Sequence, residues 1–145
     1  MEDLKQTYNL FLDDFRFPHF CLHYMANNVY GNLKWEIVRS YDEFVKFITD
    51  KYAQGELPLL VSYDHDLADS HYDTAEYTVE QLMAYYETED REKTGYDCAK
   101  WFVDFCIENK IYMSDFLVHS MNMAGRENIK SYLRNFKIHQ SKHGV

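Results

Sequence analysis

The chain has 145 residues and a formal net charge of −9, from 15 Lys and Arg against 24 Asp and Glu. A chain of this length supports one compact domain, here residues 1–145, and a content of 46% hydrophobic residues excludes a wholly disordered chain. The acidic balance argues against non-specific duplex-DNA binding, which depends on attraction between basic residues and phosphates.

No apolar run approaches the roughly 18 residues of a membrane span, so we expect no membrane partner. Residues 1–5 lack the basic start and apolar stretch of a signal peptide, and we therefore expect a cytoplasmic protein.

Three apolar runs in the first half of the chain predict β-strands, and two of them end in acidic residues. The runs cover residues 8–12, 35–39 and 57–63. Asp13 and Asp14 follow the first run, and Asp64-His65-Asp66 follows the third. This pattern is typical of buried strands that carry carboxylates at their carboxyl ends.

Helical patterns alternate with these strands. Capping residues and apolar stripes predict helices that begin near Ser40, Thr78, Thr94 and Gly125. Further strands are expected over residues 116–118 and 136–139. The alternation predicts an α/β layer fold with a mainly parallel sheet and right-handed crossovers.

Residues 68–93 differ in composition from the rest of the chain, with eight Asp and Glu against Arg91 and Lys93. This excess of charge predicts a solvated insertion, of which one stretch packs as the short helix from Thr78. We expect the insertion to overhang the site or to bind a protein partner, and we expect the core not to depend on it.

The cysteines and aromatic residues are predicted to belong to the core. Cys21, Cys98 and Cys106 contain no CxxC pair, which indicates reduced core residues. The aromatic fraction of 17% could supply stacking platforms for bases, but the rings are scattered through core-patterned segments, so we favour packing.

Acidic residues at the strand ends are candidates for a metal site. Ligands bind beyond the carboxyl ends of the strands in open parallel sheets, so these residues are predicted to converge. Asp13, Asp14 and Asp64 offer the hard oxygen ligands that hold Mg²⁺ or Mn²⁺. Asp66 would face the same side as Asp64 if the strand geometry continues, with His65 turned away into a structural role.

Other polar residues are candidates for phosphate chemistry. His119 could be a metal ligand, a general acid or base, or a hydrogen-bonded core histidine. Ser120, Asn122 and Gly125 precede or begin the last helix, where free N–H groups bind anions, although Asn122 fits equally as a helix cap. Arg16 could neutralise a phosphate or form a salt bridge with the acids.

Taken in order, these motifs resemble those of the cyclic-phosphate processing receiver-like domains. The matching elements are the DDxR element at residues 13–16, the DHDL element at 64–67, Thr94–Asp97, and the HSxN element at 119–122 with Gly125 and Arg126. The resemblance implies a receiver-like (flavodoxin-like) three-layer fold with insertions at 19–34 and 68–93 and a truncated C-terminus. Met123 stands where the family often has Pro.

The resemblance also implies a function and an acidic pocket. The function is metal-dependent hydrolysis of a cyclic phosphate on a nucleotide or an RNA end, as in RNA repair, with Asp64 and His119 catalytic. The implied metal ligands are Asp13, Asp14, Asp64 and Asp66, and the implied phosphate-binding residues are Arg16, Ser120, Asn122 and Gly125.

Two other functions stay open at this point. In a phospho-accepting signalling receiver, Asp64 would accept the phosphate, and Ser120 and Lys137 would bind it. Against this hypothesis, residues 19–34 show no clean amphipathic helix and a second acid follows Asp64. The third hypothesis is a non-catalytic module that binds a nucleotide, or a protein partner through the acidic insertion.

Overall fold

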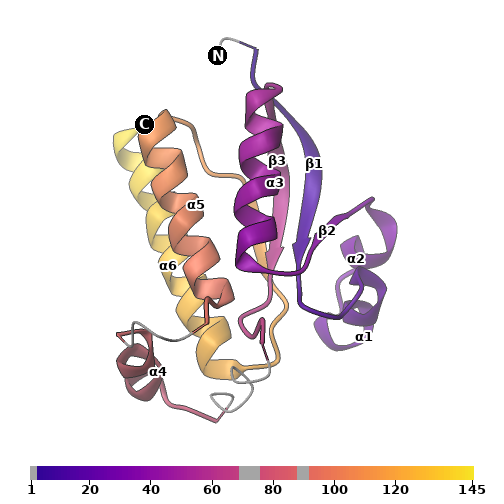
Figure 1. Ribbon diagram of the computed structural model, residues 1–145, viewed down its shortest axis with the longest axis vertical. Coiled ribbons are helices and arrows are strands. Elements are labelled where there is room, and N and C mark those ends of the chain that lie inside the picture. The colour runs from indigo at the N-terminus through magenta and orange to yellow at the C-terminus, as the bar shows by residue number, and fades with distance from the viewer. Residues whose placement is uncertain (1–2, 69–75, 88–91) are drawn as a thin grey trace.

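The computed structural model describes residues 3–68, 76–87 and 92–145, which form a four-stranded β-sheet with helices packed against it (Figure 1). The strands are β1 Lys5–Leu12, β2 Glu36–Val38, β3 Glu56–Tyr63 and β4 Asp115–Val118. The helices are the 3-10 helix η1 Pro18–Phe20, α1 Cys21–Met25, α2 Val29–Asn32, α3 Tyr41–Ala53, α4 Val79–Tyr86, α5 Gly95–Asn109 and α6 Met123–His143. The predicted α/β fold is confirmed.

The strands are ordered β2-β1-β3-β4, and every neighbouring pair is parallel. Leu12 is in register with both Val38 and Tyr63, and Tyr63 is in register with Val118. The strands therefore end at one level, so the residues that follow them emerge together at one edge of the sheet.

The two faces of the sheet bury different helices, because successive side chains of a strand point to opposite faces. Leu10 and Leu12 pack into the larger core with side chains of α3, α5 and α6. Phe11, between them, packs against Cys21 of α1 and Tyr30 of α2. Residues 19–34, expected as an insertion, thus supply part of the core.

Capping residues explain why the longer helices begin where the sequence predicted. Thr78 and Thr94 each form a complete capping box, at the starts of α4 and α5. The Ser40 hydroxyl accepts a hydrogen bond from the Glu43 amide at the start of α3. The N-cap residues of α1 and α2 form no side-chain hydrogen bond, and no capping pattern predicted these two helices.

The predicted strand at 136–139 is wrong, because these residues continue α6 to His143. The buried Gln140 anchors the last turns of the helix to the segment before β4. Its side-chain carbonyl accepts a hydrogen bond from the Met113 amide at 2.9 Å, and its amide donates to the Ile111 carbonyl at 3.0 Å. Packing of this helix therefore satisfies two backbone groups of the loop.

The acidic insertion contains the expected helix, α4, and the packing of this helix argues against the expectation that the core does not depend on the insertion. Leu82 is fully buried, and the Tyr86 ring stacks on Tyr96 of α5 with ring centroids 4.6 Å apart. The rest of the proposed insertion includes residues 69–75 and 88–91, which lie outside the described residues.

The structure also bears on the cysteines and on membrane-spanning helices. Cys21, Cys98 and Cys106 are buried and form no disulfide, as expected of reduced core residues. In the described parts of the chain, no helix has the length and apolar character needed to cross a membrane.

Candidate metal and phosphate site

Asp13, Asp64 and His119 lie side by side at the carboxyl edge of the sheet. Backbone pairing continues one residue beyond the strands, since the Asp64 amide donates to the Leu12 carbonyl and the His119 amide to the Tyr63 carbonyl, both at 3.0 Å. One ligand atom from each of the three residues lies within 4.8 Å of the others, and all three are buried. The predicted convergence of these strand ends is confirmed.

Both oxygens of the Asp13 carboxylate accept hydrogen bonds. Oδ1 accepts from the backbone amides of Phe15 at 3.0 Å and Arg16 at 2.9 Å. Oδ2 accepts from His119 Nε2 at 3.0 Å and from Arg16 Nη1 at 3.3 Å. Burial opposes ionisation, but the bond from His119 and those from the two amides outweigh it and lower the pKa of Asp13 to about 2.

The Asp64 carboxylate is less well satisfied than that of Asp13. Oδ1 accepts a hydrogen bond from the His65 amide at 2.9 Å. Oδ2 is buried, has no hydrogen-bond partner among the described residues, and lies 3.6 Å from Arg16 Nη1. Burial and repulsion from Asp13 raise the pKa of Asp64 well above its usual value, while Arg16 acts against them.

A buried carboxylate oxygen without a hydrogen-bond partner destabilises the fold, and a bound cation would remove that destabilisation. The two carboxylates and the imidazole supply two oxygen ligands and one nitrogen ligand around a common point. This donor set fits a divalent metal with positions left open for other ligands.

His119 is held in one orientation by a buried chain of hydrogen bonds. Its Nδ1 lies 2.7 Å from Ser62 Oγ, which lies 2.7 Å from the Tyr30 hydroxyl. Because Nε2 faces the Asp13 carboxylate, which can only accept, the ring proton is assigned to Nε2. Ser62 then donates to Nδ1, and Tyr30 donates to Ser62.

The environment of His119 also favours its neutral form. The ring stacks on Phe11, with centroids 4.3 Å apart and planes 8° apart. Burial lowers the pKa of His119 below its usual value, although the bond to Asp13 acts in the opposite direction. At neutral pH the ring is therefore an uncharged imidazole. To bind a metal through Nε2, the ring would take the other tautomer, with its proton on Nδ1 donated to Ser62 Oγ.

Arg16 is the positive charge of the site. Its guanidinium lies within 4.0 Å of both Asp13 and Asp64, so the salt bridge considered from the sequence is present. The loop that carries Arg16 is held by Arg39, whose Nη1 donates to the backbone carbonyls of Asp13 and Arg16. Arg16 thus partly offsets the two carboxylates beside the candidate metal ligands.

Asp66 lies outside the group formed by Asp13, Asp64 and His119. Its Oδ1 is 2.8 Å from His65 Nδ1 and accepts a hydrogen bond from Asn122 Nδ2 at 3.2 Å. The other ring nitrogen of His65 is hydrogen-bonded to the Tyr86 hydroxyl. Asp66 thus orients a buried histidine, and His65 has the structural position that the sequence indicated.

Ser120, Asn122 and Gly125 form the start of α6 and are mostly engaged within the protein. The Asn122 side chain accepts a hydrogen bond from the Gly125 amide at 3.0 Å, and Ser120 Oγ accepts from the Asn122 amide at 3.1 Å. A Cβ atom at Gly125 would lie 2.4 Å from His65 Cγ. Asn122 is therefore the helix cap that the sequence allowed as an alternative to a phosphate ligand.

Two further candidates are not members of the three-residue group. Asp14 is half-buried, and its charge adds to the burial and the Asp13 repulsion that raise the pKa of Asp64. Lys137, the phosphate ligand of the signalling hypothesis, pairs with Asp115 at the first residue of β4. Asp115 is in register with Leu60 of β3, so Lys137 pairs beside the middle of that strand and not at its carboxyl end near Asp64.

Sequence reasoning missed the residues that hold His119 and the Arg16 loop in place through hydrogen bonds. Ser62 is a polar residue that follows the apolar run Leu57–Val61 of β3, which is a usable signal for a buried hydrogen bond. Tyr30 gave no such signal, because its partner Ser62 is 32 residues away in the sequence. Arg39 likewise acts on a loop that is distant along the chain.

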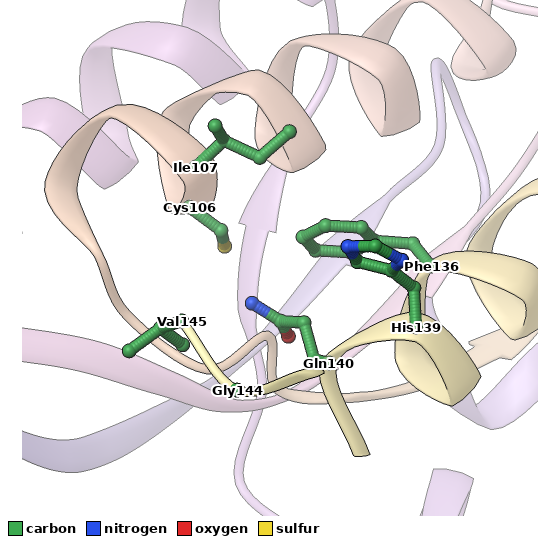
Figure 2. A pocket seen from close by; sticks show the side chains of 7 residues that line it. All are labelled: Cys106, Ile107, Phe136, His139, Gln140, Gly144 and Val145. Atoms are coloured by element: carbon green, nitrogen blue, oxygen red, sulfur yellow. The ribbon is translucent and has the colours of Figure 1, made fainter. Parts of the chain in front are cut away.

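A separate cavity lies at the other end of the molecule (Figure 2). It has a volume of about 290 Å³ and lies between the ends of α5 and α6 near the C-terminus. Its lining residues are Cys106, Ile107, Phe136, His139, Gln140, Gly144 and Val145. None of the predicted site residues belongs to this lining.

Comparison with known proteins gives one match. A family model described as "Cyclic-phosphate processing Receiver domain" matches residues 8–135. No curated protein and no solved structure shows significant similarity to the chain. The matched range includes all four strand ends and the residues around Asp13, Asp64 and His119.

Proposed function

Because this chain belongs to the family of cyclic-phosphate processing receiver domains, we propose that it is a metal-dependent hydrolase that opens a cyclic phosphate on a nucleotide or an RNA end. Its receiver-like, flavodoxin-like α/β fold is that of the family. The observation that carries the proposal is Asp64 Oδ2, a buried oxygen with no hydrogen-bond partner in the described chain, next to Asp13 and His119.

Asp13, Asp64 and His119 would hold the metal. Three protein ligands leave positions open for water and for a phosphoryl oxygen. The imidazole nitrogen in the set favours Mn²⁺ over Mg²⁺, because Mg²⁺ prefers oxygen ligands. When bound, the ion polarises a phosphoryl oxygen and lowers the pKa of a bound water.

Arg16 is placed to bind the phosphate. Hydrolysis joins the water oxygen to phosphorus and breaks one P–O bond of the ring. One water proton ends on the released hydroxyl, and the other is released to solvent. The phosphate gains negative charge in this process, and a fixed guanidinium next to it stabilises that charge. Arg16 is already held against both carboxylates by salt bridges, so its position needs little rearrangement.

The residues at the start of α6 shape the site in this proposal. Ser120, Asn122 and Gly125 hold His65 and the helix start in place through their mutual contacts. Asp66 fixes the His65 ring. We assign to these four residues the positioning of the Asp64 segment, and to Arg16 the contact with the phosphate.

A turnover assay tests the proposal. Purified protein is incubated with 2′,3′-cyclic and 3′,5′-cyclic nucleotides in EDTA, Mg²⁺ or Mn²⁺. We expect metal-dependent formation of a nucleoside monophosphate from at least one of these compounds.

Asp64→Asn should lower turnover by about 100-fold or more, since it removes a metal-ligand charge at nearly constant size. The control is Asp50→Asn, an exposed residue of α3 that pairs with Lys46, and it should leave turnover unchanged. A folded Asp64→Asn protein with near-normal turnover would overturn the assignment of the site.

The same proteins separate hydrolysis from phospho-acceptor signalling. Lys137, the phosphate ligand of the signalling hypothesis, pairs with Asp115, which is in register with Leu60 and not with the strand end at Asp64. We expect acetyl phosphate to give no stable aspartyl phosphate in mass spectrometry. Stoichiometric phosphorylation of Asp64 would favour the signalling receiver instead.

A further inference from the structure

Three phenylalanine rings are exposed in the short segment that follows Asp13. Phe15, Phe17 and Phe20 are 56%, 46% and 53% exposed. Phe11, which precedes them on β1, is fully buried. Phenylalanine is usually a core residue, so three half-exposed rings within six residues form an unusual surface. We call Phe15, Phe17 and Phe20 the aromatic rim.

Each ring of the aromatic rim has a packed neighbour that contributes to its position. The Arg16 guanidinium lies 4.6 Å from the centroid of the Phe15 ring, and that of Arg39 lies 4.7 Å from the Phe17 ring. The His19 ring lies 4.3 Å from the Phe20 ring, centroid to centroid. The rings are therefore supported by neighbours and still expose about half of their surface.

The aromatic rim is directly connected to the candidate site through Arg16. The guanidinium that contacts Phe15 also lies 3.3 Å from Asp13 Oδ2 and 3.6 Å from Asp64 Oδ2. Its Nη2 lies 3.6 Å from the sulfur of Met121, a residue that is 63% exposed. One arginine side chain thus connects the buried carboxylates, an exposed ring and an exposed thioether.

We propose that the aromatic rim stacks the base of a nucleoside cyclic phosphate whose phosphate lies at Arg16. This inference rests on the proposed function and names its substrate class. Bases stack on exposed aromatic rings, and neighbouring guanidinium groups add to such contacts. Phosphate at Arg16 and base at the rings require a ligand with one anionic end and one flat apolar end, which is a nucleotide.

The overall charge favours a small ligand over a long one. The chain carries a net charge of −9, which repels an extended polyanion, whereas Arg16 and Arg39 supply positive charge locally at the rim. A mononucleotide or the terminal nucleotide of an RNA fits this distribution. A long polyanion does not.

The test compares two probes that differ only in the base. The first is adenosine 2′,3′-cyclic phosphate, and the second is methyl β-riboside 2,3-cyclic phosphate, which keeps the ribose and the cyclic phosphate. Binding is measured by calorimetry. Turnover is measured by anion-exchange chromatography of the phosphomonoester product, and both measurements are made in Mn²⁺. We expect the adenosine compound to bind roughly tenfold more tightly.

Variants assign the difference to the rings. Phe17→Ala and Phe20→Ala should each reduce or remove the preference for adenosine while leaving the riboside compound unaffected. Phe20→Trp should keep the preference, because it retains an aromatic face. The matched control is Tyr112→Ala, which removes a 62% exposed ring just after α5, away from the site.

The outcomes separate the rim from the proposed hydrolysis. Equal binding of both probes by the wild-type protein would overturn base stacking, and turnover of both would leave the hydrolase standing. Tight, ring-dependent adenosine binding without turnover of this probe or of the 3′,5′-cyclic nucleotides would support the rim and overturn the hydrolase. Absence of binding of both probes would overturn the assignment of a nucleoside 2′,3′-cyclic phosphate to the rim, and the hydrolase would then depend on the result with 3′,5′-cyclic nucleotides.

The exposed rings could instead bury themselves against a second copy of the chain. Sedimentation of the wild-type protein and Phe20→Ala resolves this outcome. A wild-type dimer that the variant loses, together with an unchanged preference between the probes, would overturn the nucleotide assignment.

Discussion

At the scale of single residues, the metal-free site depends on a chain of hydrogen bonds in which the acceptor-only carboxylate of Asp13 sets the donor and acceptor roles of the other groups. Asp13 only accepts, so His119 donates to it from Nε2, and Ser62 must then donate to Nδ1. All of these side chains are buried, so water cannot replace a missing partner easily. Removing one hydroxyl therefore leaves a neighbour unsatisfied.

Ser62→Ala should lower the free energy of unfolding by about 1–3 kcal/mol, because it leaves His119 Nδ1 and the Tyr30 hydroxyl without their partner. Urea denaturation in EDTA measures this loss. Ser114→Ala is the matched control, since Ser114 is also buried but its Oγ has no hydrogen-bond partner within the described residues. Equal losses in the two variants would show that burial of the serine, and not the hydrogen-bond chain, is responsible.

Asp64→Asn should raise the stability of the metal-free protein at pH 7. The pKa of Asp64 is raised in the folded state, so ionisation of this group destabilises the fold as the pH rises above its unfolded value near 3.8. The variant removes that charge and should therefore flatten the loss of stability between pH 4 and pH 7. Urea midpoints in EDTA across this range measure it.

Asp13→Asn should have the opposite effect. The pKa of Asp13 is lowered to about 2 in the folded state, so the ionised carboxylate stabilises the fold, and that stability is lost as the pH falls from about 4 towards 2. The variant should be less stable than the wild type at pH 7. If both variants shift stability in the same direction, the electrostatic account of the pair is wrong.

The sequence identified Asp13, Asp64 and His119 because each follows an apolar strand, and parallel strands end at one edge. It could not separate Asp66 from Asp64, because the backbone leaves strand geometry after Tyr63 and the two carboxylates acquire different partners. Side-chain direction beyond a strand end depends on tertiary contacts, which local spacing does not contain.

At the scale of elements, α4 is a mostly apolar helix within an acidic segment. Glu80 is its one acidic residue, Leu82 is buried, and Tyr86 reaches His65 beside the site. The composition of residues 68–93 reflects the acids on either side of this helix and conceals its apolar stripe.

Leu82→Ala should therefore lower the free energy of unfolding by about 2–5 kcal/mol, as expected for a leucine removed from a packed core. Val79→Ala, on the exposed side of the same helix, should change it by less than about 0.5 kcal/mol. Urea denaturation of both variants gives the comparison. If Leu82→Ala changes the free energy of unfolding only slightly, the core does not depend on the insertion, as the sequence suggested.

Helices and strands were predictable where the local signal was strong. The capping residues Ser40, Thr78 and Thr94 mark three helix starts correctly. Helices α1 and α2 are short and uncapped, and they form because Cys21 and Tyr30 pack on Phe11, a contact that is not local in sequence.

At the scale of the whole molecule, the three proposed metal ligands come from positions 13, 64 and 119, on segments that follow three different strands. Metal binding would therefore depend on the folded sheet, since the unfolded chain does not keep these residues together. Such a ligand stabilises the native state by mass action.

The melting temperature should rise with Mn²⁺ concentration, with about 1.4 kcal/mol of added stability per tenfold increase above the dissociation constant. Differential scanning fluorimetry from EDTA to millimolar Mn²⁺ measures the rise. Asp50→Asn should keep it and Asp64→Asn should lose it. A rise of equal size in both proteins would place the metal elsewhere.

The close contacts made by Gly95 and Gly125 limit how this molecule can be redesigned. A methyl group at Gly95 would lie 1.6 Å from the Asp64 carbonyl oxygen, and one at Gly125 would lie 2.4 Å from the His65 ring. Libraries that vary the helix starts should therefore yield mainly inactive or unfolded proteins. Phe15, Phe17 and Phe20 contact solvent instead, so new substrate preferences should be sought first by randomising these three positions, with the acidic edge left unchanged.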